Sequence, residues 1–225
     1  MDISPDLRLK PLAENVWIHV SDIPMPPWGK VSANGLAAIK AGRLVLIDTP
    51  WNDAQTAALV EWFRGHCEFR DIIVIVCHYH DDNLGGLGWV NRNRMDSCAL
   101  EMTRKICREK GLPVPGQAID EELRQEFLRT GIEIFYPGEG HTPDSICVYL
   151  PEEKILFGGC SVKALGNTTL GNTAEANLAA WPDTLRRMKA VFPQAKTVVP
   201  GHGEEGDLSL IDHTLTLFRG AVPGN

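Results

Sequence analysis

One segment limits what this chain can become, because an apolar strand runs straight into a cluster of histidine and aspartate residues. Residues 72–76 are all aliphatic, which predicts a buried strand. His78, His80 and Asp82 follow at two-residue spacing, and the paired glycines at 85–86 are expected to let the backbone turn tightly. Zinc accepts both imidazole and carboxylate ligands. The segment therefore predicts a catalytic metal site, the alternative being a polar loop whose histidines are only solvated.

Composition narrows the function classes. The chain has 225 residues, enough for one sizeable core or two small ones. Its net charge of -7, with no basic patch, argues against a nucleic-acid partner. No apolar run approaches the roughly 18 residues of a membrane span. Residues 1–6 are acidic and lack the hydrophobic core of a signal peptide, so the protein is expected to be cytosolic or a mature form whose targeting segment is gone.

Strand and helix patterns alternate along the chain. Residues 21–30 contain three prolines and a glycine, which predicts a loop; its Met25 and Trp28 either cover a pocket or lie against the surface beneath. His19 sits in an apolar alternation and is expected to be structural. The pattern predicts two packed sheets with helices outside. Residues 7–20 are expected to form a strand, a turn and a strand. The other expected strands are at 34–39, 44–47, 72–76, 132–136, 145–150, 155–157 and 196–199, and the expected helices are at 53–64, 87–91, 99–110, 182–191 and 211–219.

Five strand ends carry candidate polar groups. They are Asp48, the cluster at 78–82, His141, Cys160 and His202. Groups that follow neighbouring strands converge in space, and glycines flank the last three, which permits close backbone approach. These positions together favour a metal site over coincidence. Asp48 either braces the metal loop through backbone hydrogen bonds or is an ordinary turn residue.

The donor types suggest two zinc ions. Three neutral imidazoles suit a tetrahedral zinc with its fourth position open to water. They belong to His78, His80 and His141. A carboxylate, a thiolate and an imidazole suit a second zinc. They belong to Asp82, Cys160 and His202. Two zinc ions about 3.5–4 Å apart can share a hydroxide whose parent water has a pKa near 7, which favours hydrolysis without a covalent intermediate.

These motifs resemble a known family. The His-x-His-x-Asp segment, Gly140-His141-Thr142, Gly158-Gly159-Cys160 and Pro200-Gly201-His202 are similar to the metallo-beta-lactamases, specifically the dizinc first subclass of class B. The resemblance runs from Asn15 to the last helix. It implies an α+β fold: a four-layer αβ/βα sandwich in one domain over 1–225, with two similar halves of about 1–115 and 116–225 and the zinc site in a groove at one edge.

The resemblance also implies an activity and the residues that perform it. The activity is hydrolysis of the lactam ring of penicillins, cephalosporins and carbapenems, which confers antibiotic resistance. Lys163 would pair with the substrate carboxylate, unless it is a solvated surface lysine. Asn172 would donate a hydrogen bond to the lactam carbonyl, with Asn167 as a rival. Trp28 and Met25 would lie on a loop over the substrate. The catalytic residues implied are Asp82, Lys163 and Asn172.

Two other functions stay open at this point. Thioesterases of the same fold, such as glyoxalase II, carry an Asp-His pair after the His-x-His segment and an aspartate where Cys160 stands. Here Asn83 follows Asp82, which argues against them. A non-catalytic zinc domain would need a zinc ion whose four positions are all filled by protein ligands. The expected three-histidine site, with its fourth position open, does not favour this.

Location and cysteine chemistry complete the expectations. The resemblance implies export to the periplasm, with a leader removed, and nothing in the sequence suggests anything but a monomer. Six cysteines without a dense framework do not predict a disulfide scaffold. Cys77, beside His78, either packs beneath the metal loop or tunes the zinc from behind.

Overall fold

The computed structural model describes residues 1–27 and 29–218, and the chain divides into two compact units. The first unit is Met1–Glu126 and the second is Phe127–Asn225. The near-equivalence of two halves, expected from the sequence, stays a prediction. No helix in the described ranges is long and apolar enough to cross a membrane.

The first unit contains an eight-stranded sheet in the order β1 to β8. Neighbours from β1 to β5 are antiparallel, whereas β5 to β8 run parallel. Parallel strands end at the same edge of a sheet, so the residues that follow β5 and β6 are brought together there. The strands are β1 Asp2–Ser4, β2 Leu7–Ala13, β3 Val16–Pro24, β4 Lys30–Lys40, β5 Arg43–Ile47, β6 Asp71–Ile75, β7 Asp96–Ala99 and β8 Gln117–Ala118.

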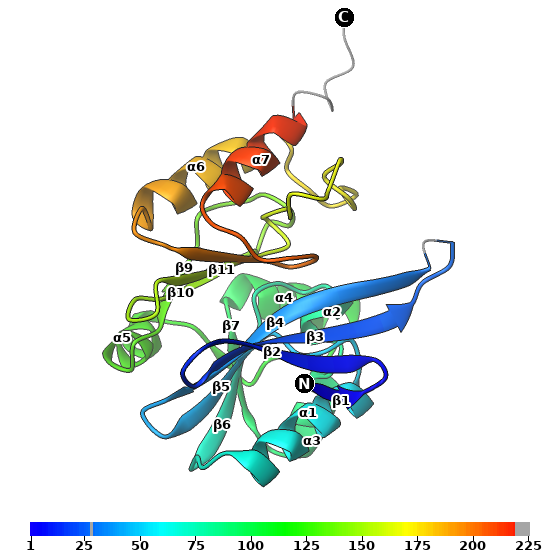
Figure 1. The fold of residues 1–225 in the computed structure, drawn as a ribbon, viewed down its shortest axis with the longest axis vertical. Coiled ribbons are helices and arrows are strands. Elements are labelled where there is room, and N and C mark those ends of the chain that lie inside the picture. Colours follow the sequence, from blue (N-terminus) through cyan, green and yellow to red (C-terminus); the bar gives the residue numbers. More distant parts are fainter. Residues whose placement is uncertain (28, 219–225) are drawn as a thin grey trace, which may run out of the picture. The chain divides into compact units, whose positions relative to one another are not determined.

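Helices α1 (Asp53–His66) and α3 (Leu87–Arg92) lie side by side in this unit (Figure 1). The side chain of Asn52 caps α1 by accepting the N–H of Gln55 at 2.9 Å, as its sequence position predicts. Buried residues of α1 such as Phe63 pack into the apolar core with the aliphatic residues of β5 and β6. The other helices are α2 Asp81–Leu84, α4 Glu101–Lys110 and α5 Glu121–Arg129, which spans the boundary between the units in sequence.

The predicted loop at 21–30 was wrong over half of its length, because residues 21–24 and 30 belong to strands. Strands β3 and β4 pair from Val16↔Ala38 to Pro24↔Lys30, which leaves only residues 25–29 as the connection. Pro24 is the last residue of β3. Proline has no backbone N–H to donate, but at the end of a strand this breaks no hydrogen bond in the interior of the sheet. Met25 lies on the connection and is partly exposed, whereas Trp28 falls outside the described residues.

The second unit contains a four-stranded sheet in the order β12-β11-β10-β9. Strands β9 (Glu133–Phe135), β10 (Cys147–Leu150) and β11 (Ile155–Gly159) are antiparallel neighbours, but β12 (Thr197–Pro200) runs parallel to β11. Helices α6 (Trp181–Val191) and α7 (Ser209–Leu217) lie against each other in this unit (Figure 1). Their apolar residues form its core together with side chains of β10 to β12. With one sheet in each unit and helices beside it, the fold class is α+β, as predicted.

Candidate metal centre

The ligand loop of the first unit begins where β6 ends. The N–H of Val76 still donates to Cys98 O at 2.9 Å, which extends the pairing with β7, and the chain then turns into α2 with His80 as its N-cap. His78, His80 and Asp82 each offer one ligand atom, and these atoms all lie within 4.8 Å of one another. His78 and Asp82 are buried, and His80 is partly exposed. The structure therefore brings these three predicted ligands together.

Asp48 holds both sides of this loop. Its carboxylate accepts the backbone N–H of Cys77 at 2.7 Å and a side-chain N–H of Asn83. The residue has a φ of +64°, which aspartate tolerates better than most residues. Burial raises the pKa of Asp48 well above its usual range, against the opposing effect of the hydrogen bonds from Cys77 and Asn83. Of the two roles left open for Asp48, the structure confirms the bracing one.

The chain turns at Gly85 and Gly86, between α2 and α3, as expected, but the glycines serve close packing and not backbone freedom. Their φ angles of -59° and -93° are ordinary for any residue. A Cβ on Gly85 would lie 2.0 Å from the carbonyl oxygen of Trp51, and one on Gly86 would lie 1.8 Å from Thr56 Oγ1. The missing side chains thus let the segment after the ligands pack directly against α1 and the chain leading into it.

In the second unit, Cys160 and His202 follow the ends of the parallel neighbours β11 and β12. Cys160 Sγ lies 3.5 Å from His202 Nε2. Gly201 makes this approach possible, because a Cβ there would lie 2.4 Å from the same sulfur. The N–H of Gly201 also donates to Gly159 O at 2.8 Å, which ties the two loops together. The structure therefore places this predicted pair of donors side by side.

His141 lies on the loop between β9 and β10 and is 5% exposed. Its ring centroid is 5.7 Å from that of Trp181 at the start of α6. A Cβ on Gly140 would come within 3.0 Å of the indole, which explains the glycine before the histidine. The indole N–H donates to the carbonyl oxygen of Ser161, the residue after Cys160, at 2.9 Å. Trp181 thus contacts the surroundings of two predicted ligands, a role that its sequence position alone did not reveal.

The donors in each unit fit zinc. Imidazole, thiolate and carboxylate are its usual protein ligands, whereas calcium and magnesium prefer all-oxygen sets. None of the six cysteines, all of which lie within the described residues, forms a disulfide, and the sulfur of Cys160 faces the imidazole of His202. Cys77 is buried, and both its backbone N–H and its side chain form hydrogen bonds with the carboxylate of Asp48.

Lys163 is a buried residue, which excludes the solvated surface position. Its side chain is 6% exposed, and Nζ donates to Cys160 O at 2.9 Å and lies 5.4 Å from the Trp181 ring centroid. A Cβ on Gly171 would be 3.9 Å from this Nζ, so the ammonium group lies near the loop that carries Asn172. Asn172 is exposed, and its Oδ1 accepts the N–H of Ala174 at 3.1 Å. That bond leaves the amide NH₂ as the group directed to other partners.

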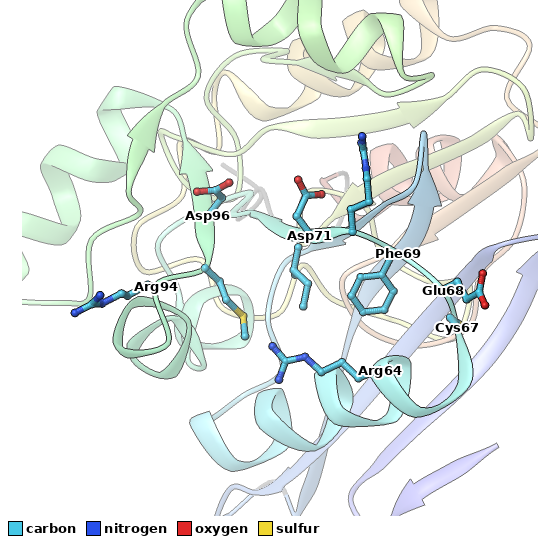
Figure 2. Close-up of a pocket in the computed structure, with 10 residues that line it drawn as sticks. Arg64, Cys67, Glu68, Phe69, Asp71, Arg94 and Asp96 are labelled. Carbon is cyan, nitrogen blue, oxygen red and sulfur yellow. The ribbon is translucent and has the colours of Figure 1, made fainter.

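A cavity of about 490 Å³ in the first unit lies apart from these donors. It is lined by the end of α1, the first residues of β6 and the start of β7 (Figure 2). Because β6 runs from Asp71 towards His78, the cavity is at the opposite end of that strand from the ligand loop. Three arginines and three acidic residues line it, and Figure 2 shows Arg94 directed away from the rest. None of the six predicted ligands is among its lining residues.

Comparisons with known proteins agree with this arrangement of donors. Residues 39–202 match the family model of the metallo-beta-lactamase superfamily. "Metallo-beta-lactamase type 2" of Bacteroides fragilis is 42% identical over 94% of this chain and 85% of its own length, and that of Pseudomonas aeruginosa is 39% identical over 93% and 83%. The crystal structure of VMB-1 has a TM-score of 0.91 at 40% identity, covering 97% of this chain and 99% of the other. The chain therefore belongs to the metallo-beta-lactamase superfamily.

Proposed function

We propose that this protein is a zinc-dependent beta-lactamase that opens the lactam ring of penicillins, cephalosporins and carbapenems. The observation that supports this most is the donor pair Cys160 and His202, held 3.5 Å apart at the ends of two parallel strands. The thioesterase pattern differs at Cys160 and also after Asp82, where Asn83 donates to Asp48 and is not a histidine. The curated relatives named above carry the same activity in their names.

The six donors would hold two zinc ions. His78, His80 and His141 would bind the first, and Asp82, Cys160 and His202 the second. Support comes from the donor chemistry and from the family match, which spans all six positions. When bound, zinc supplies a water molecule that is acidic enough to act as a nucleophile near neutral pH. Asp82 would be catalytic through its place in the second set.

Lys163 and Asn172 would orient the substrate. The ammonium group of Lys163, held by Cys160 O and lying near the loop of Asn172, would supply the positive charge that pairs with the substrate carboxylate. The Asn172 amide, with its oxygen engaged by Ala174, would present its NH₂ to the lactam carbonyl. Met25, on the connection between β3 and β4, and Trp28 would also contact the substrate.

The location is carried over from the resemblance, and the oligomeric state from a sequence in which nothing points to oligomerisation. We expect a monomer in the periplasm, and we expect carbapenems to be among the substrates. Size-exclusion chromatography with light scattering, at the concentration used for kinetics, measures the oligomeric state directly. A dimer at that concentration would contradict it.

A substrate panel tests the reaction class. The zinc-loaded protein is offered nitrocefin, a penicillin, a carbapenem and S-lactoylglutathione under the same conditions. We expect turnover of all three lactams and none of the thioester. Thioester turnover without lactam turnover would replace the proposal with a glyoxalase II-like activity.

The substitution Lys163→Ala tests the proposed carboxylate contact. Loss of a charge-assisted hydrogen bond should raise KM for nitrocefin about 10–100-fold, with a smaller effect on kcat. Lys189→Ala is the matched control, because Lys189 pairs with Asp212 on the exposed side of the helices. An unchanged KM in Lys163→Ala would remove Lys163 from the substrate site.

A further inference from the structure

Two consecutive residues of α7 reach the segment that carries Lys163. Thr214 is fully buried, and its Oγ1 accepts the backbone N–H of Lys163 at 2.8 Å while donating to Leu210 O at 2.7 Å. His213 Nε2 lies 2.9 Å from the carbonyl oxygen of Asn167. A carbonyl oxygen only accepts, so Nε2 of His213 carries the proton in this bond.

These bonds hold two points of one short loop. The loop leaves Cys160, places Lys163 and then turns at Ala164, whose carbonyl accepts the N–H of Asn167 at 3.0 Å. Thr214 fixes the backbone at the residue whose Nζ must reach Cys160 O and the Trp181 ring. His213 fixes the far side of the turn, four residues later. Helix α7 thus holds the backbone of this loop at Lys163 and at Asn167.

We propose that His213 and Thr214 are positioning residues that hold Lys163 and the loop at 164–173 in the geometry needed to bind the substrate carboxylate. This inference rests on the proposed function. Because both contacts are to the backbone, the effect does not depend on the side chains of the loop itself. Substrate binding rather than the bond-breaking step is what the two residues serve.

Variants of α7 test the proposal. His213→Ala and Thr214→Val each remove one contact, His213→Gln and Thr214→Ser keep a group that can make it, and Thr216→Val is the control. Thr216 lies on the same helix, but its hydroxyl donates a hydrogen bond to His213 O, which is a contact within α7 itself. We expect His213→Ala and Thr214→Val to raise KM for nitrocefin about tenfold and to change kcat less than about twofold. The conservative variants and Thr216→Val should stay near the parent, with equal zinc content throughout.

A double-mutant cycle separates positioning from general destabilisation. If Thr214 acts through Lys163, the effect of Thr214→Val on KM should fall below about twofold in a Lys163→Ala background. The same tenfold increase in both backgrounds would overturn the proposal. So would KM values in His213→Ala and Thr214→Val that match Thr216→Val.

Amide hydrogen exchange provides a readout without substrate. In the zinc-loaded protein, Thr214→Val should speed exchange of the Lys163 amide about tenfold or more, and His213→Ala should do so across 165–171. If the parent hydrolyses no lactam, the proposed function fails and the substrate part of this inference fails with it, but the exchange data still decide whether α7 orders the loop. If Thr214→Val does not fold, His213→Ala carries the same comparison. Exchange equal to the parent in both variants would overturn the positioning role.

Discussion

His19 occupies a site that cannot accommodate its charged form. It is 1% exposed on β3 and pairs with Gly35 on β4. A Cβ on Gly35 would lie 2.3 Å from the His19 ring, so the imidazole fills the space that the glycine leaves. Burial lowers the pKa of His19 from 6.5 to about 4. The histidine is therefore neutral at physiological pH and serves the core, as its place in an apolar alternation predicts.

This burial makes stability depend on pH. The unfolded chain takes up a proton at His19 near pH 6.5 and the folded chain only near pH 4, so the folded state is favoured above pH 6.5 and loses stability as pH falls towards 4. Between pH 7 and pH 5 the loss should be about 2 kcal/mol. Urea unfolding of the metal-free protein and of His19→Gln, which does not titrate, measures it. Parallel pH profiles for the two proteins would contradict the assignment.

Cys160→Ser tests how the donors are divided between the zinc ions. Loss of the thiolate should weaken the site of Asp82, Cys160 and His202 by at least about 100-fold, with little change at the three-histidine site. Competition with a chromophoric chelator resolves the two affinities. Cys67→Ser is the control, because Cys67 is the partly exposed thiol at the end of α1. Equal weakening of both sites would refute the division.

Single residues also mark the limit of what the sequence predicts. The donors themselves could be recognised, because the residue type alone identifies histidine and cysteine as possible zinc ligands. Their supports could not: that Trp181 contacts both His141 and Ser161, or that Lys163 is buried, depends on packing between segments far apart in sequence. Asp48 was recognised only as one of two alternatives, because a turn residue and a brace have the same sequence pattern.

Pairs of parallel strands do the positioning at the scale of elements. Asp48 and Cys77 follow β5 and β6, and Cys160 and His202 follow β11 and β12. In each unit a pair of parallel neighbours brings residues far apart in sequence within 3.5 Å of each other. Rigid strands hold such groups more accurately than loops alone would.

Gly201→Ala tests the second of these pairs. The new Cβ would overlap Cys160 Sγ, so the thiol must move away from His202. We expect zinc affinity at the cysteine-containing site to fall at least about tenfold, with the fold retained. Gly65→Ala, on α1 with open space around it, should leave both zinc affinities unchanged. Unaltered zinc binding in Gly201→Ala would show that the close approach at Gly201 is not required.

Elements with a clear apolar period were predicted well, and those without one were not. The helix predicted at 53–64 and the strand at 44–47 match α1 and β5 closely. Helix α5 was missed because five of its nine residues are charged and it buries only Phe127. Strand β7 was missed, since Asp96 and Ser97 give it no apolar alternation, and its last residue, Ala99, was assigned to the helix that follows. Strand β3 was cut short because the prolines beyond it were read as ending regular structure earlier than they do.

Across the whole molecule, the family match covers the predicted donors of both units. The first unit carries His78, His80 and Asp82, and the second carries His141, Cys160 and His202. The match over residues 39–202 includes all six. The fold could be named from the sequence because these motifs are specific. The two halves expected at about 1–115 and 116–225 stay a prediction, whereas the compact units divide between Glu126 and Phe127.

Zinc content per chain, measured together with nitrocefin turnover before and after a chelator, tests the central claim most directly. We expect two zinc ions per chain, turnover that ceases when chelation removes them, and recovery when zinc is restored. Turnover that survives complete removal of zinc would contradict the account, and so would a fully zinc-loaded protein that leaves nitrocefin intact.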